Sequence, residues 1–198
     1  MSRRGAAPAT VAQGDLLDRV ARALNDAPGG RPFVLTLPAP LLDPLALLVP
    51  GDDAFLWADR AGTVSAARGR VTRLAADGPG RFTHLADQGR RLIGQLRHAG
   101  LDGDATVPRL FGGAAFIPGA AAGEDWRGFG DASFDLPRLA LVGDAEHGTH
   151  LQLALPDPRL PNERKHLLQE LERVLAAVPS LPPAPLRLRG DVAADAER

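Results

Sequence analysis

The hydrophobic positions along the chain predict three amphipathic helices separated by short strands. Apolar residues recur at helical spacing over 16–24, over 81–99 and from about 161 to 178. The first pattern ends before two glycines, and Gly100 follows the second, as at many helix C-termini. The positions expected to face the core are Leu16, Leu17, Val20, Ala21 and Leu24; Phe82, Leu85, Ala86, Leu92, Ile93 and Leu96; and Leu167, Leu168, Leu171, Val174, Leu175 and Val178.

Short apolar runs bounded by turn residues predict the strands. They lie at 32–38, 54–58, 63–67, 110–117, 133–142 and 149–155, with hairpin turns at 59–62 and 143–148. The run 110–117 is apolar on both faces and suits a central strand covered on both sides. Pro137 places its strand at a sheet edge or a bulge. Between the first two strands, Asp43 and Pro44 predict a capped helical turn.

Hairpins with helices between them indicate an α+β fold, with a largely antiparallel sheet and helices packed on it. We expect a disordered leader over 1–10, an α+β domain over 11–178, and a proline-rich linker with a polar tail over 179–198.

Composition narrows the function classes. The 198 residues carry a net charge of −1, which provides no electrostatic drive toward nucleic acid. The absence of cysteine excludes disulfides, thiolate zinc sites and a cysteine nucleophile. The longest apolar stretch, 38–50, is interrupted by Asp43 and by prolines and is too short for a membrane span. No signal peptide is expected, because no apolar segment follows the two arginines near the N-terminus. A cytoplasmic protein that binds neither nucleic acid nor membrane is expected.

Candidate chemical groups are few. Lys165 is the only lysine, so chemistry that needs a lysine would have to use it. His147 and His150 lie three apart in a predicted turn and strand start, without a third ligand nearby, which argues against a metal site. The other histidines, His84, His98 and His166, are expected on or beside polar helix faces and exposed to solvent.

The remaining short patterns have structural explanations. Gly112 and Gly113 precede no helix and fit close backbone packing better than phosphate binding. Asp52 and Asp53 belong to a turn. Arg189, Gly190 and Asp191 match an adhesion tripeptide by letters only. Core or interface positions are expected for three large aromatic residues: Trp57, Trp126 and Phe129. The residues alone therefore predict no catalytic, cofactor or metal site.

Several segments in order carry a family resemblance. They are 54–60, 78–82, 109–116, 126–134 and 136–142; the most specific are the Phe-Gly-Gly strand and the Trp…Phe…Asp-Ala…Phe…Leu-Pro stretch. Over residues 30–178 the chain resembles the N-terminal portion of isochorismate synthases. These enzymes belong to the chorismate-utilising family, which also contains the anthranilate and aminodeoxychorismate synthases.

The resemblance implies the N-terminal half of the anthranilate-synthase-like α/β sandwich. It also implies magnesium-dependent conversion of chorismate to isochorismate, for menaquinone or for siderophore or salicylate biosynthesis. In the family, a lysine base on a Lys-Val-Val-Leu-Ala-Arg strand, a glutamate acid and the magnesium-binding glutamates lie in the second half. No position here matches them, and Lys165 lies at the start of the last predicted helix. No catalytic residue is therefore carried over, and no cofactor is expected in this chain.

Three hypotheses remain open. The chain is the N-terminal half of an isochorismate synthase, inactive alone, whose partner is a separate catalytic C-terminal half and whose complete form acts on chorismate; this predicts an exposed apolar docking surface. Alternatively, it is a non-enzymatic binding module that retains the fold, with a polar surface at that place. A complete enzyme with new chemistry would require chorismate turnover by this chain alone, which no residue pattern supports.

Overall fold

The computed structural model describes residues 13–39, 42–48, 53–60, 63–101, 103, 106–120, 123–126, 128–144 and 148–176. The predicted leader 1–10 and tail 179–198, which includes Arg189-Gly190-Asp191, lie outside these residues, as do Asp52, His147 and Val178. The helices are α1 (Gln13–Asp26), α2 (Arg81–Gln95) and α3 (Pro161–Ala176), with short 3-10 turns η1 (Pro44–Leu47) and η3 (Glu124–Trp126). The strands are β1 (Phe33–Pro38), β2 (Ala54–Ala58), β3 (Val64–Arg68), β4 (Thr72–Ala76), β5 (Arg97–Gly100), β6 (Phe111–Ala114), β7 (Ala132–Leu136), β8 (Leu139–Asp144) and β9 (Gly148–Leu155).

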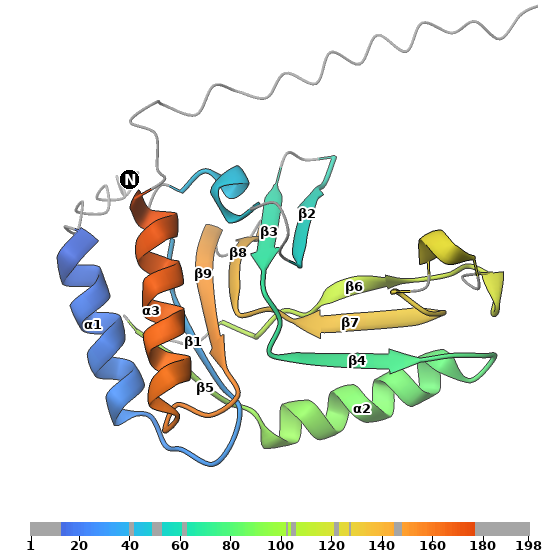
Figure 1. Cartoon of the computed structure of the whole chain (residues 1–198), viewed down its shortest axis with the longest axis horizontal. Coiled ribbons are helices and arrows are strands. Elements are labelled where there is room, and N and C mark those ends of the chain that lie inside the picture. Colours follow the sequence, from blue (N-terminus) through green and yellow to red (C-terminus); the bar gives the residue numbers. More distant parts are fainter. Residues whose placement is uncertain are drawn as a thin grey trace, which may run out of the picture.

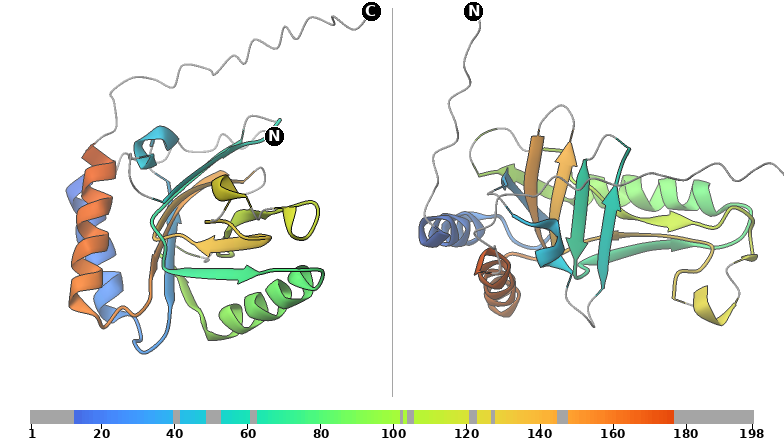
Figure 2. Two further views of the ribbon diagram at one scale, coloured as in Figure 1. Left: turned by 45° about the vertical axis from the view of Figure 1, so that its right-hand side comes forward. Right: turned by 90° about the horizontal axis from the view of Figure 1, so that it is seen from above.

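The strands form two sheets that run crosswise to each other (Figure 1). The large sheet has the order β2-β3-β8-β9-β1-β5, and the small sheet has the order β4-β7-β6. Every neighbouring pair is antiparallel except β1 and β5. α1 and α3 lie side by side over one face of the large sheet, and α2 packs on the small sheet (Figures 1 and 2). The predicted α+β fold and both predicted hairpins are confirmed.

The main core lies between the large sheet and the helix pair α1–α3. Val20 and Leu24 of α1 and Leu167, Leu171, Val174 and Leu175 of α3 are buried there against apolar side chains of β1, β8 and β9. Each large aliphatic side chain buried in this way contributes about 1.5–3 kcal/mol. The predicted inner faces of α1 and α3 are confirmed. The predicted cap is also present, because the Asp43 carboxylate accepts a hydrogen bond from the Leu45 N–H at 2.9 Å.

The second helix differs from its prediction in length and in its buried face. It ends at Gln95 rather than Ala99, because Leu96 is extended and the next residues form β5 beside β1, with Phe33 opposite Arg97. Pairing with β1 supplies strand hydrogen bonds that outweigh one more helical turn. Leu85 and Leu92 are buried as expected, whereas Phe82 and Ile93 are exposed.

The predicted strand 133–142 is two strands in different sheets. β7 belongs to the small sheet and β8 to the large one, and the chain passes between them at Pro137. Proline has no N–H to continue a ladder. On its two sides, the Leu136 carbonyl accepts from Val71 next to β4, and the Arg138 carbonyl accepts from Ala154 of β9. Pro137 thus marks a change of sheet rather than an edge or a bulge.

The predicted central strand 110–117 is wrong in its position. β6 covers only Phe111–Ala114 and forms an edge of the small sheet, with Gly112, Gly113 and Ala114 exposed. An apolar run alone does not distinguish a covered strand from an edge that is open to solvent. β4, on the other side of β7, has no counterpart among the predicted strands.

A buried ionic cluster joins α3 to the large sheet. Glu170 lies on the apolar face of α3, with its carboxylate 4.0 Å from Arg68 Nε and 3.7 Å from Arg138 Nε. Arg138 also pairs with Glu163 at 2.6 Å, and His166 Nε2 lies 3.4 Å from Glu170. Glu170 and Arg68 are both buried. Charged partners on β3 and on the β7–β8 connection therefore fix the position of α3 on the sheet.

Candidate binding site between the two sheets

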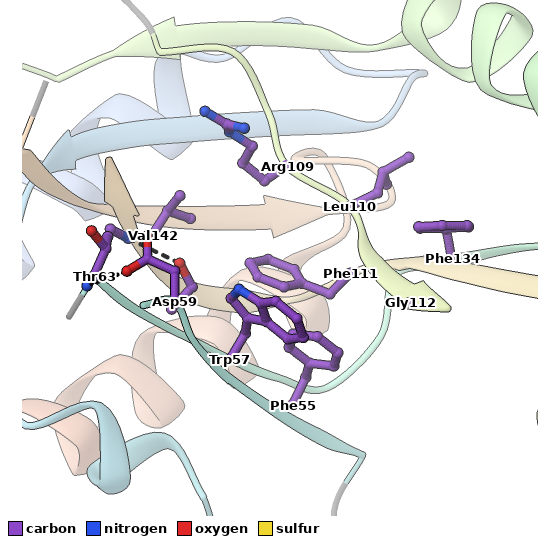
Figure 3. Close-up of a pocket in the computed structure, with 12 residues that line it drawn as sticks. Phe55, Trp57, Asp59, Thr63, Arg109, Leu110, Phe111, Gly112, Phe134 and Val142 are labelled. Atoms are coloured by element: carbon purple, nitrogen blue, oxygen red, sulfur yellow. Dashed lines mark hydrogen bonds between the residues drawn. The ribbon is translucent and has the colours of Figure 1, made fainter. Parts of the chain in front are cut away.

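A cavity of about 400 Å³ lies where the β2–β3–β8 end of the large sheet meets β6 and β7 of the small sheet (Figure 3). It opens on the sheet face opposite the one that α1 and α3 cover. Its lining residues come from both sheets: Phe55, Trp57, Asp59, Thr63, Ser65, Arg109, Leu110, Phe111, Gly112, Phe134, Val142 and Gly143. Neither sheet forms this site alone.

Aromatic side chains form one wall of the cavity. Phe55 and Trp57 alternate with outward-facing residues on β2 and so share one face of the strand. The Phe55 and Phe111 rings pack with centroids 5.1 Å apart, and this contact bridges the two sheets. Trp57 lies beside these rings and is 61% exposed, so the wall reaches solvent (Figure 3). Trp57 was expected in the core or at an interface; in the structure it lies at the exposed rim of the cavity.

A buried glutamine fixes the segment that enters β6. The Gln152 side chain of β9 is fully buried. Its oxygen accepts from the Arg109 N–H at 2.7 Å, and its amide nitrogen donates to the Arg109 carbonyl at 3.1 Å. Both polar ends of Gln152 are therefore used to hold one residue. The Arg109 guanidinium points away from the aromatic wall (Figure 3).

The other polar groups at the cavity serve its turns and strands. The Asp59 carboxylate accepts from the Thr63 N–H at 2.8 Å, and the Ser65 hydroxyl accepts from the Gly143 N–H at 3.1 Å. Such a site can hold a flat or apolar group against the aromatic wall. Asp59, its one carboxylate, already closes a turn, so the lining presents no general acid–base pair.

The described residues do not provide a magnesium site. No group of three or more histidine or acidic side chains in this part of the chain is arranged to hold a metal ion. Magnesium prefers carboxylate and other oxygen ligands, and no cluster of them lies at the cavity. His150 is buried on β9, whereas His84, His98 and His166 are exposed as predicted. Lys165 is exposed on α3, across the large sheet from the cavity.

The two glycines of β6 have different surroundings. A Cβ atom on Gly112 would overlap the Ser133 carbonyl oxygen and lie 2.6 Å from Phe134 Cα, so β7 lies too close for a side chain there. Gly113 has open space at the same position. Close backbone packing is therefore confirmed for Gly112, and the backbone that packs against it is that of β7 in the same sheet.

A polar network at the far end of the small sheet was not visible in the sequence. Asp131 is buried, and its carboxylate accepts from the Gly78 N–H at 2.8 Å and the Gly119 N–H at 2.7 Å. The Arg81 guanidinium, also buried, donates to the carbonyls of Ala115 and Phe116. Gly78 and Gly119 have φ of +76° and +78°, a conformation that favours glycine. In the sequence, these two glycines were the one sign that ordered turns lie here.

Acid should weaken the fold through Asp131 and Asp157. Hydrogen bonds from Gly78 and Gly119, and then the Arg81 charge, lower the pKa of Asp131; hydrogen bonds from Arg159 and Gly30 lower the pKa of Asp157. A carboxyl whose pKa is lower in the folded state stabilises the protein above its unfolded pKa of about 3.9. This contribution is lost as the pH falls through the folded value.

The measurement is urea unfolding at a series of pH values from 7 down to 3. Asp131→Asn should be less stable than the native chain at pH 7, and its stability should fall less steeply below about pH 4. Asp157→Asn is an independent check at a distant turn. Parallel curves for native and variant chains would contradict this assignment.

No helix in the described ranges is long and apolar enough to cross a membrane. Comparison with known families finds one matching model, described as a chorismate binding enzyme, over residues 20–184. No curated protein matches the chain. The matched range contains both sheets, the cavity between them, α2, α3 and the second half of α1. The chain therefore belongs to the chorismate binding enzyme family.

Proposed function

We propose that this chain is the N-terminal portion of an isochorismate synthase and that a separate catalytic half completes it. Family membership supports an enzyme that handles chorismate. Within the family, the Phe-Gly-Gly strand that forms β6 and the stretch from Trp126 to Pro137 resemble isochorismate synthases in particular. Conversion of chorismate to isochorismate is the activity of the completed enzyme.

The observation that carries the proposal is the unpaired edge of the small sheet at β6. β6 is an edge strand that contains no charged residue and no proline, the devices that usually protect such an edge. Large apolar side chains are also exposed in the structure: Leu45, Leu56, Trp57, Phe82, Ile93, Val107, Phe116, Ile117, Trp126, Phe129 and Leu160. Phe116 and Ile117 of this set follow β6 directly, and a free edge beside exposed apolar side chains favours an interface with another polypeptide.

The proposal divides the work between the halves. The described residues provide an aromatic cavity and a scaffold, and they lack a cluster of carboxylates that could bind magnesium. The lysine base, the glutamate acid and the magnesium ligands expected from the family would all come from the catalytic half. This chain alone would then be inactive toward chorismate.

A non-enzymatic module with the same fold is less well supported. Such a module would be expected to carry polar residues where the catalytic half once packed, because a persistent apolar patch promotes aggregation. Phe116 and Ile117, directly after β6, are exposed instead. These side chains favour the enzyme half over the free module.

The test is turnover of chorismate with magnesium, measured as isochorismate formed. The catalytic half is sought in the DNA after codon 198, in all three frames and in neighbouring genes, by its Lys-Val-Val-Leu-Ala-Arg-type strand. The mixture should exceed either chain alone by roughly 10²-fold or more, because the acid–base groups act only in the assembled enzyme. Turnover by this chain alone, or full activity of the catalytic half without it, would overturn the proposal.

A further inference from the structure

We infer that the free end of the small sheet is the surface on which the catalytic half docks; this inference rests on the proposed function. The surface consists of five exposed apolar side chains, called here the lobe tip: Phe82, Phe116, Ile117, Trp126 and Phe129. They lie at the N-terminus of α2 and in the connection between β6 and β7. This end of the molecule lies farthest from α1 and α3 (Figure 2).

The side chains of the lobe tip are at least half exposed and lie in one region of the fold. Phe116 is fully exposed, and Ile117 is 68% exposed. Trp126 and Phe129 are each more than half exposed, although their rings pack edge to face at 5.9 Å. The two aromatic rings therefore support each other while both keep a free surface. Phe82 is 57% exposed beneath the Arg81 guanidinium.

The polar network described above holds this exposed segment in place. At the start of the segment, Arg81 donates hydrogen bonds to the carbonyls of Ala115 and Phe116. The Asp131 carboxylate accepts one from the Gly119 N–H. The Ala115 N–H donates to the Asp131 carbonyl at 2.7 Å, which closes the two ends of the connection together. Arg73 of β4 also donates to the Gly128 carbonyl at 2.9 Å. Hydrogen bonds from the buried Arg81 and Asp131 thus fix a segment whose apolar side chains face solvent, a costly arrangement unless a partner covers them.

The area of the lobe tip matches what a stable interface needs. With about 150–250 Å² for each large aromatic side chain, the five residues expose on the order of 600 Å². A standard interface buries about 800 Å² per partner, of which somewhat more than half is apolar. The lobe tip alone can therefore supply the apolar part of one complete interface.

The position of the lobe tip identifies the catalytic half as its occupant. β6 runs directly into the tip through Ala115, so the free strand edge and the exposed side chains form one continuous surface. The tip projects from the molecule (Figure 2) and so fits a concave apolar surface. A second polypeptide that extends the small sheet along β6 would cover the tip at the same time.

The experiment measures binding of the catalytic half to the native chain and to two matched double variants. Phe116→Ser with Phe129→Ser removes two side chains of the lobe tip. Leu45→Ser with Leu160→Ser removes two similarly exposed side chains elsewhere, on η1 and before α3. The tip variant should bind about 100-fold more weakly or worse, as interface anchors do, and the control should bind within about threefold of the native chain.

Hydrogen exchange provides a second readout that needs no substitution. Binding should slow exchange of the amides at 111–120 and 128–131 and leave those of α1 and α3 unchanged. Equal binding by the tip variant and the native chain, or protection elsewhere only, would overturn the docking surface while the proposed function stands. If the catalytic half binds neither the native chain nor the control, the proposed function itself fails.

Discussion

A Gly112→Ala substitution should separate β6 from β7 and lower the free energy of unfolding by about 3 kcal/mol. The added methyl group would overlap the Ser133 carbonyl oxygen and press on Phe134 Cα, and both are backbone atoms of the neighbouring strand. Backbone atoms cannot rotate away as a side chain can, so the strands must move apart. Phe111 would then lose its position against Phe55, and the cavity between the sheets would open.

Gly113→Ala is the matched control. It lies one residue further along the same edge strand, with nothing within 4 Å of the added atom. Its unfolding free energy should stay within about 0.5 kcal/mol of the native value, as for other unconstrained surface substitutions. Urea unfolding gives the free energies, and hydrogen exchange of the β6 amides shows where the structure loosens. Similar losses in both variants would mean that glycine flexibility, rather than contact with β7, matters here.

A Glu170→Gln substitution should cost about 3 kcal/mol, because it removes the carboxylate that the buried Arg68 and the partly buried Arg138 share. Arg68 and Arg138 approach Glu170 from two sides, and Arg138 also pairs with Glu163. The charge that stabilised them is removed while the side-chain shape is kept. Looser packing of α3 around Glu170 is the expected structural result, while the apolar side chains of α3 keep the helix on the sheet.

Glu172→Gln provides the comparison on the same helix, since Glu172 is exposed. It removes the same charge from α3 without touching the buried cluster, and its effect should stay below about 0.5 kcal/mol. Thermal and urea unfolding of both variants measure the difference. Equal stability of the two variants would show that the cluster contributes no more than a surface charge.

The sequence predicted the elements whose signals are local. α1, α3 and the Asp43 cap follow from spacing and turn chemistry within a few residues. The two hairpins follow from apolar runs around short turns. β5 and the division of β7 from β8 could not be predicted in this way. Both depend on partners distant in sequence: β1 for the first, and the two separate sheets on either side of Pro137 for the second.

The candidate site was less accessible to sequence reasoning than the fold. Its aromatic wall joins Phe55 of β2 to Phe111 of β6, and its supporting Gln152 comes from β9. These residues share a site only after both sheets have formed. Charged residues are normally expected on the surface, so Arg81 and Asp131 gave no sign that they are buried. The family resemblance, in contrast, depended on short contiguous stretches and pointed to the family that the match over residues 20–184 shows.

The strand order of the large sheet has a consequence for how the chain is made. β1 lies between β5 and β9, and Phe33 pairs with Leu155. During synthesis β1 therefore emerges long before its antiparallel partner exists. Contacts between such distant segments form slowly, and an unpaired apolar strand promotes aggregation in the interval. The large sheet closes late, and a ribosome that stalls before Leu155 leaves β1 exposed on the nascent chain.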